Sequence, residues 1–307
     1  MLCAMPSAPS SPPSAQKLAV IGDPIAHSLS PALQNFLIRH FALPFTYEAL
    51  QIRQNELSEM IQRLRDGEFR GINITLPHKQ TVLPFLNELE VTAEKIGAAN
   101  TIVAEAGRLI GYNTDACGFS RSLETAGVLI ANKKAFVLGA GGAARAVIFA
   151  LLQANAGQII VCNRNAARAA TLIAAFANHT TANQLQNAPW LERADWIKKN
   201  EVHLLINTTR VGMHPYEAES PLPDHAFSAP MAVIDLVYNP VQTKFLRMAN
   251  SAGAKIVNGL GMLIYQGVAA LELWSRERLD LNPIYKKLEN ELSGASTFNS
   301  RTTAFSD

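Results

Sequence analysis

Short apolar runs alternate along this chain with longer segments in which apolar residues recur every three or four positions. The runs at residues 18–21, 45–50 and 71–74 are predicted to be buried strands, and the segments 31–40 and 55–65 between them have helical spacing. Strands that alternate with helices in this way are typical of a mostly parallel sheet covered by helices. The first part of the chain is therefore predicted to be an α/β unit.

The alternation of strands and helices is interrupted by a predicted hairpin and then resumes. Residues 99–103 and 108–112 flank a connection that contains Gly107, which predicts a hairpin, and a helix is expected over residues 115–126. Strands are then expected at 135–138, 159–162, 203–206, 232–235 and 255–257, and helices at 145–155, 243–252 and 260–276. This predicts a second α/β unit, whose last helix is long enough to return to the first.

We therefore expect two α/β domains with a ligand cleft between them. The 307 residues of the chain are enough for two domains of ordinary size. The first domain is assigned to residues 17–114 plus 262–293, and the second to 115–261. Residues 1–16 are rich in Pro and Ser and are expected to be a disordered tail rather than a secretory signal. Residues 294–307 are polar without periodicity and are expected to be a second disordered tail.

Composition argues against several classes of function. The chain is 48% hydrophobic and 17% charged, with a net charge of +2 and no cluster of Lys and Arg for nucleic-acid binding. No apolar run approaches the length of a membrane span. The cysteines Cys3, Cys117 and Cys162 lack paired spacing, and the histidines form no H-x-x-x-H pair. We expect a cytoplasmic protein without disulfide, metal site, nucleic-acid partner or membrane partner.

A glycine-rich turn follows the predicted strand 135–138. Gly139 and Gly141 allow a tight turn and close backbone approach, so that the next helix would direct its N-terminus at a pyrophosphate. Arg164 ends the next strand, where an NAD-binding fold usually carries an acidic residue, and Arg168 lies one helical turn further on. The charge favours a ribose with a 2′-phosphate, and therefore NADP rather than NAD.

Polar residues cluster where strands and helices of the first domain are expected to end. Ser30 and Pro31 have the residue types of a helix N-cap and first turn, and Ser28 adds a second hydroxyl. The serines either cap this helix or bind a carboxylate at its N-terminus. Asn73 and Thr75 alternate at the end of a predicted strand, so both side chains can face the same side.

Three further residues admit a structural and a functional interpretation. Lys79 is expected in the first turn of a helix, where the positive end of the dipole disfavours a cation; an exposed lysine is the alternative. Asp115 begins another predicted helix, either as its N-cap or as an acidic partner of Lys79. Asn100 precedes a predicted strand and by itself is typical of a turn.

Taken together, these motifs resemble those of the shikimate dehydrogenase family. The resemblance covers residues 17–292 in the family's order, in the segments 28–30, 73–79, 99–101, 111–118, 139–145, 163–164, 206–213 and 265–267. It implies reversible, NADP-dependent reduction of 3-dehydroshikimate to shikimate, a step of chorismate and aromatic amino-acid biosynthesis. It also implies that the first domain binds the substrate and that the second is a Rossmann-like NADP-binding domain.

The resemblance implies a role for each matching residue. Lys79 and Asp115 would form the catalytic acid–base pair. The shikimate carboxylate would be held by Ser28 and Ser30. The rest of the substrate would be contacted by Asn73, Thr75, Asn100, Tyr238 and Gln266. NADP would be bound by Gly139, Ala140, Gly141, Gly142, Ala143, Asn163, Arg164, Asn165, Arg168, Thr208, Met213 and Gly261.

Two positions depart from the family pattern: Asn165 stands where Thr commonly follows Asn-Arg, and Arg210 replaces a more usual Ser. One alternative is a quinate/shikimate dehydrogenase that also uses NAD. Another is a non-catalytic nucleotide-sensing homologue, against which the presence of both Lys79 and Asp115 argues. A methyltransferase uses a similar turn, but Arg164 has the wrong charge for its bare ribose. The expected partner is a small-molecule substrate, and a homodimer is left open.

Overall fold

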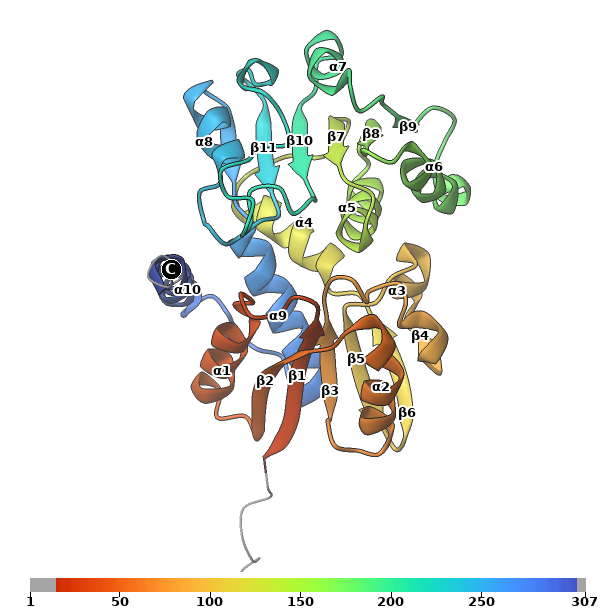
Figure 1. Ribbon diagram of the computed structural model, residues 1–307, viewed down its shortest axis with the longest axis vertical. Helices are drawn as coiled ribbons and strands as arrows, with labels where there is room; N and C mark the ends of the chain where they lie inside the picture. The colour runs from red at the N-terminus through yellow and green to blue at the C-terminus, as the bar shows by residue number, and fades with distance from the viewer. Residues whose placement is uncertain (1–14, 303–307) are drawn as a thin grey trace, which may run out of the picture.

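Two α/β units, one above the other in Figure 1, make up residues 15–302, the part of the chain that this computed structural model describes. The chain passes from the lower unit to the upper one along α4 (Asp115–Thr125) and returns along α9 (Leu260–Ser275), which packs against α4. The expected fold class is confirmed. The division into residue ranges stays a prediction, and residues 1–14 and 303–307 of the predicted tails lie outside the described residues.

The lower unit contains a mixed six-stranded sheet with the order β2-β1-β3-β5-β6-β4. Its strands are β1 (Gln16–Gly22), β2 (Phe45–Gln51), β3 (Gly71–Ile74), β4 (Glu88–Leu89), β5 (Thr101–Glu105) and β6 (Arg108–Tyr112). Strand β1 is parallel to β2 and β3, and β4 is parallel to β6, whereas β5 is antiparallel to both neighbours. The predicted hairpin is confirmed as β5 and β6, and it introduces the antiparallel pairs.

Apart from α9, which shares a core with β1 and β2, the helices that cover this sheet are short. They are α1 (Ser30–His40), α2 (Leu57–Arg65), α3 (Val91–Ile96) and the 3₁₀ turns η1 (Gln54–Glu56) and η2 (Leu83–Phe85). The helix expected at Lys79 was wrong, because residues 76–82 form successive turns. The reason is a tertiary contact: the buried ring of His78 bonds through Nε2 to the carbonyl of Ile52, 2.6 Å away, and fixes the turn in place of a helix.

The upper unit has an all-parallel sheet with the order β12-β11-β10-β7-β8-β9. Counted within this unit the order is 3-2-1-4-5-6, that of a dinucleotide-binding Rossmann fold. Its strands are β7 (Lys134–Leu138), β8 (Gln158–Cys162), β9 (Leu185–Asn187), β10 (Leu204–Asn207), β11 (Ala232–Asp235) and β12 (Lys255–Val257). Its helices are α5 (Gly142–Gln153), α6 (Ala166–Ala175), α7 (Arg193–Lys199), α8 (Lys244–Ser251) and the 3₁₀ turns η3 (Ala177–His179) and η4 (Asp224–Ala226).

Both faces of this upper sheet are buried. Along β7, Val137 packs into the core beneath α4 and α5, whereas Phe136 and Leu138 pack into a second core on the opposite face with Phe245 of α8. Burial on both faces explains why the strands of a parallel sheet are continuous apolar runs in the sequence.

The last helix, α10 (Tyr285–Thr302), extends beyond the expected start of the tail at residue 294. Leu288 and Leu292 are buried in the core that α1 and α9 share, so the helix is anchored before that point. A single glycine in a helix interior costs only about 1 kcal/mol, so Gly294 does not end the helix. The helix thus continues to Thr302, through residues for which a disordered tail was expected, and the start of that tail stays a prediction.

Candidate active site

A cavity of about 150 Å³ lies between the two units and is lined by both. The structure brings together in its wall every residue predicted to be catalytic or to contact the substrate: Ser28, Ser30, Asn73, Thr75, Lys79, Asn100, Asp115, Tyr238 and Gln266. Apolar residues that the sequence did not single out complete the wall, among them Val20, Leu236, Met262 and Leu263. The cavity is thus small and is lined by polar and apolar side chains of both units.

Lys79 and Asp115 form an ion pair in this wall. Lys79 Nζ lies 2.5 Å from Asp115 Oδ2, and the two side chains are 17% and 6% exposed. Asp115 is the first residue of α4, but Thr114 is the N-cap and makes no side-chain capping bond. The capping interpretation of Asp115 was therefore wrong, since its carboxylate is directed at Lys79 instead.

Asn100 is buried and holds the other oxygen of that carboxylate. Its Nδ2 donates to Asp115 Oδ1 and to Thr114 Oγ1, both at 2.9 Å, and its Oδ1 accepts from the Thr114 N–H at 2.8 Å. It is 2% exposed, so it is not a solvent-facing turn residue. Because both amide hydrogens have protein partners, Asn100 is occupied mainly in orienting Asp115.

Asn73 has a partner that the sequence did not reveal. The Tyr47 hydroxyl donates to Asn73 Oδ1 at 2.6 Å, and Asn73 Nδ2 donates to Thr101 Oγ1 at 3.0 Å. Burial raises the pKa of Tyr47 well above its ordinary value, and the neighbouring Tyr238 adds to the rise. A buried tyrosine hydroxyl on a strand requires a polar partner, which is the one signal that could have pointed to Tyr47.

Ser28 and Ser30 lie at the start of α1, but neither is its N-cap. The N-cap is Leu29, and the Ser28 Oγ accepts from the Ser30 N–H at 3.2 Å. The expected capping role of Ser30 was therefore wrong, because Ser28 already serves the first N–H. Tyr238, from the loop after β11, is partly buried here; desolvation raises its pKa, while hydrogen bonds with the Ser28 side chain and the Leu29 backbone act in the opposite direction.

Gln266 faces the cavity from α9 and is 9% exposed, so it does not face bulk solvent. Its Nε2 donates to the Leu263 carbonyl at 2.9 Å. Gly118 on α4 permits this placement, because a Cβ there would lie 2.8 Å from both Gln266 Cβ and the Met262 carbonyl oxygen. The close approach of α4 and α9 thus brings Asp115 and Gln266 into one wall.

The glycine turn between β7 and α5 has the backbone geometry of a phosphate cradle. Gly139 has φ +113°, and a Cβ there would overlap Thr208 Oγ1. Gly141 is the N-cap of α5 without a side-chain cap, and a Cβ there would meet nothing within 4 Å. The start of α5 thus has no side-chain cap and has open space beside Gly141, as anion binding requires. Ala143 reaches the cavity wall itself.

The residues after β8 add positive charge to the same unit as the glycine turn. Asn165 is the N-cap of α6, and its Oδ1 accepts from the Arg168 N–H at 3.1 Å. Asparagine caps as well as threonine does, so this departure from the family pattern preserves the local structure. Arg164 and Arg168 are exposed and form no ion pair within the described part of the chain. Two cations thus stand beside a helix N-terminus.

Three further residues predicted to contact NADP are Thr208, Met213 and Gly261, and they do not all lie beside the glycine turn. Thr208 lies next to the glycine turn and donates through Oγ1 to the Leu138 carbonyl at 2.7 Å. Met213 lies further along the same loop, where its N–H donates to the Arg210 carbonyl at 3.0 Å. Gly261 instead packs against α4 and α10, since a Cβ there would meet Ser122 and the Tyr285 hydroxyl at 3.3 Å.

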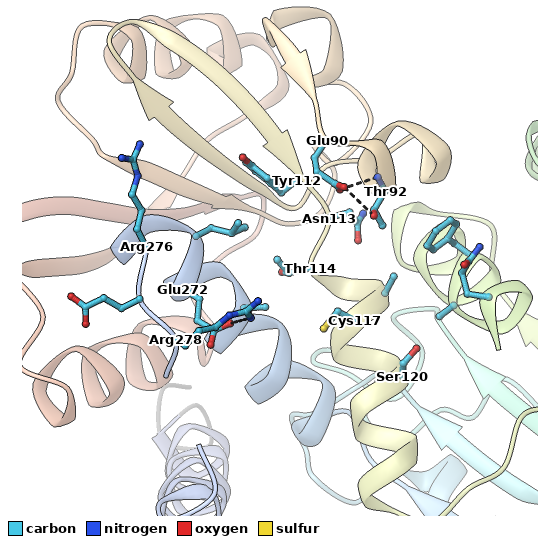
Figure 2. Close-up of a pocket in the computed structure, with 17 residues that line it drawn as sticks. Glu90, Thr92, Tyr112, Asn113, Thr114, Cys117, Ser120, Glu272, Arg276 and Arg278 are labelled. Carbon is cyan, nitrogen blue, oxygen red and sulfur yellow. Dashed lines mark hydrogen bonds and ion pairs between the residues drawn. The ribbon is translucent and has the colours of Figure 1, made fainter. Parts of the chain in front are cut away.

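A second, larger cavity of about 590 Å³ lies on the other side of the segment that precedes Asp115. Figure 2 shows Thr114 and Cys117 facing it from the start of α4, opposite Glu272 and Arg278. None of the residues predicted to be catalytic lines this space. Its charges of both signs are partly paired with one another, as in the bond from Arg278 Nη1 to Glu272 Oε2 at 3.2 Å.

Comparison with known proteins identifies the family. Three family models match: the shikimate dehydrogenase substrate-binding domain over residues 20–102, shikimate/quinate 5-dehydrogenase over 123–205, and the shikimate 5′-dehydrogenase C-terminal domain over 259–289. The shikimate dehydrogenase (NADP(+)) of Moorella thermoacetica is 41% identical over 284 residues, which cover 91% of this chain and 94% of that protein. The chain belongs to the shikimate dehydrogenase family.

Two further members of the shikimate dehydrogenase family extend the comparison. The shikimate dehydrogenase (NADP(+)) of Carboxydothermus hydrogenoformans is 43% identical over 258 residues, which cover 83% of this chain and 90% of that protein. The crystal structure of the shikimate 5-dehydrogenase of Thermus thermophilus, in complex with NADP(H) and shikimate, has a TM-score of 0.78 at 38% identity. It covers 92% of this chain and 98% of its own. The likeness therefore spans both units.

Proposed function

We propose that this chain is an NADP-dependent shikimate dehydrogenase that interconverts 3-dehydroshikimate and shikimate. The observation that carries the proposal is the ion pair between the partly buried Lys79 and the buried Asp115, 2.5 Å apart in the wall of a small cavity. The glycine turn of a dinucleotide-binding fold adjoins the same cavity through Ala143. Relatives that match most of the chain carry this name, which supports the same substrate and cofactor here.

The cavity suits a small hydroxylated acid. Ser28 and Ser30 supply hydroxyls at the beginning of α1, where the helix dipole favours the substrate carboxylate. Asn73, Thr75 and Gln266 supply amide and hydroxyl groups for the ring hydroxyls on the other side. Because the cavity measures about 150 Å³, the substrate must be compact.

The upper unit suits NADP. The N–H groups at the start of α5 would hold the pyrophosphate, and Gly139 and Gly141 leave room for its close approach. Arg164 and Arg168 would pair with the 2′-phosphate, since no carboxylate in the described residues occupies them. When bound, NADPH supplies the hydride for reduction, and NADP⁺ accepts it in the reverse direction.

Lys79 moves the proton. In reduction its ammonium group gives a proton to the new hydroxyl oxygen of the substrate, and in oxidation the neutral amine takes that proton back. Asp115 accepts a hydrogen bond from Lys79 through Oδ2, which orients the lysine toward the cavity. Asn100 holds the second carboxylate oxygen, so Asp115 cannot rotate away during the transfer.

The test is an initial-rate assay at the nicotinamide absorbance band, with shikimate or quinate and with NADP⁺ or NAD⁺. Turnover with shikimate and NADP⁺ is expected. Lys79→Ala should lose most of kcat while KM for shikimate changes little. Lys286→Ala, at a side chain that is 86% exposed on α10, is the matched control and should behave like the unmodified chain. An unchanged kcat in Lys79→Ala would remove this lysine from the chemistry.

The same assay separates the alternatives. Turnover of quinate, or equal use of NAD⁺, would indicate a quinate/shikimate dehydrogenase. NADP binding without turnover would indicate the nucleotide-sensing homologue, although a sensor has no need for the pair of Lys79 and Asp115. Within residues 15–302, no helix combines the length and apolar character that crossing a bilayer demands. A cytoplasmic location and a homodimer stay predictions.

A further inference from the structure

A buried hydroxyl joins two of the amides that line the cavity. Thr101, the first residue of β5, is 0% exposed and does not line the cavity itself. Its Oγ1 lies 3.0 Å from Asn73 Nδ2 and 3.1 Å from Asn100 Oδ1. Because a hydroxyl has one hydrogen to donate and two lone pairs to accept with, Thr101 can serve both amides at once.

Two backbone groups determine the direction of these hydrogen bonds. The Thr114 N–H can only donate and lies 2.8 Å from Asn100 Oδ1, so the oxygen of that side-chain amide must face it. The backbone carbonyl of Asn100 can only accept and lies 3.3 Å from Asn73 Nδ2, so the nitrogen of Asn73 must face it. Thr101 therefore accepts from Asn73 and donates to Asn100.

The path continues beyond both amides. At one end the Tyr47 hydroxyl donates to Asn73 Oδ1 at 2.6 Å, and at the other Asn100 Nδ2 donates to Asp115 Oδ1 at 2.9 Å. All five residues of this path are buried. One directed hydrogen-bond path thus runs from Tyr47 to the carboxylate of Asp115, with Thr101 at its middle.

We propose that Thr101 is a positioning residue that fixes the orientation of both Asn73 and Asn100 and, through Asn100, that of Asp115. The proposal rests on the proposed function, because that function makes Asp115 part of the acid–base pair. It also predicts which group donates and which accepts where the substrate meets Asn73. Both amide hydrogens of Asn73 are taken, so only a lone pair on its Oδ1 remains for a ligand, and a substrate hydroxyl at this point must donate.

Thr101→Val tests the middle of the path, because valine has nearly the shape of threonine without the hydroxyl. The buried Nδ2 of Asn73 then loses its closer acceptor, and Asn100 loses a donor. We expect kcat and kcat/KM for shikimate to fall by about tenfold or more with KM for NADP⁺ unchanged, and Thr101→Ser to restore both. Thr46→Val, the same change at an exposed position of β2, is the matched control and should alter neither.

Tyr47→Phe tests one end of the path. It removes the bond to Asn73 and leaves the bonds between Thr101, Asn100 and Asp115 in place. We therefore expect a higher KM for shikimate with kcat retained, in contrast to the lower kcat of Thr101→Val. A merely structural role of these residues would lower the melting temperature without producing this division between KM and kcat.

Turnover of the unmodified chain with shikimate and NADP⁺ is measured first, since its failure would contradict the proposed function and not the path. A crystal structure of Thr101→Val then tests, independently of activity, whether Thr101 orients the two amides. The proposal expects Asn73 or Asn100 to rotate and the bond from Asn100 to Asp115 to lengthen. Unchanged positions of both amides, or unchanged kinetics in an active enzyme, would overturn the positioning role.

Discussion

Gly142, the first residue of α5, lies directly against the side chain of Lys79. A Cβ at Gly142 would be 3.0 Å from Lys79 Cβ and 3.2 Å from its Cδ, closer than nearly all such contacts. The glycine turn therefore also serves the lower unit: its lack of a side chain at this position leaves room for the lysine that pairs with Asp115.

Gly142→Ala should lower kcat by about tenfold, because a small displacement of a reacting group costs a large factor in rate. The extra methyl group pushes Lys79, whose pairing distance to Asp115 is 2.5 Å. Steady-state kinetics with shikimate, together with NADP⁺ titration by fluorescence, separate this effect from weaker cofactor binding. Gly142→Ser should lose more activity than the alanine variant. Full kcat in both variants would show that Lys79 accommodates the added atoms.

Most strands of both sheets could be predicted from the sequence because burial leaves a direct pattern, but the short edge strands β4 and β9, which are little buried, were missed. Residues such as Phe136 and Val137 are buried on opposite faces of β7, so the whole strand is an apolar run. The cavity residues could be predicted from their motifs, which lie at strand and helix ends where ligands bind in α/β folds.

What could not be predicted depends on contacts between distant segments. The turn that carries Lys79 is fixed by His78 and the carbonyl of Ile52, 26 residues away. The partner of Asn73 is Tyr47, which stands on another strand; a strand tyrosine needs a polar partner, but the sequence does not say which. The continuation of α10 past Gly294 depends on anchoring by Leu288 and Leu292, which a polar composition does not reveal.

Gly118→Ala should destabilise the protein by about 1–3 kcal/mol, because overpacking forces backbone shifts. The new methyl group would lie 2.8 Å from Gln266 Cβ and would separate α4 from α9, so KM for shikimate should rise as well. Thermal unfolding and steady-state kinetics measure the two effects. Cys117→Ala changes the neighbouring, exposed residue of α4, which faces the second cavity in Figure 2, and should leave both quantities unchanged. Equal melting temperatures for the two variants would contradict the prediction.

Arg164→Ala should weaken NADP⁺ binding by about tenfold to a hundredfold, the range for a lost hydrogen bond to a charged group. Binding of NAD⁺ should stay the same, because only NADP⁺ carries the 2′-phosphate. Isothermal titration with each cofactor measures the ratio of the dissociation constants. Arg247→Ala, on α8 of the same unit, removes an equal charge away from the glycine turn and should change neither constant. Equal losses for both cofactors in Arg164→Ala would contradict the assignment to the phosphate.

Asp235, at the end of β11, is fully buried and makes the stability of the upper unit depend on pH. Burial raises its pKa to about 7, while hydrogen bonds from Thr243, Val237 and Asn207 act in the opposite direction. An aspartate in an unfolded chain has a pKa near 3.9. Between these two values the folded protein holds a proton that the unfolded chain has lost, so the free energy of unfolding falls as pH rises, by about 1.4 kcal/mol per pH unit.

Asp235→Asn should remove this dependence, because the amide does not titrate. From pH 8 to pH 6 the folded protein takes up the proton on Asp235, so its melting temperature should rise by roughly 2–4 °C relative to that of the variant. Histidines and other groups that titrate in this range are common to both proteins and cancel in the difference. Calorimetric melting curves of the two proteins at pH 6, 7 and 8 measure it. If the melting temperatures of the two proteins change equally between pH 6 and pH 8, Asp235 is already ionised at pH 6. Its three hydrogen-bond donors would then outweigh the effect of burial on its pKa.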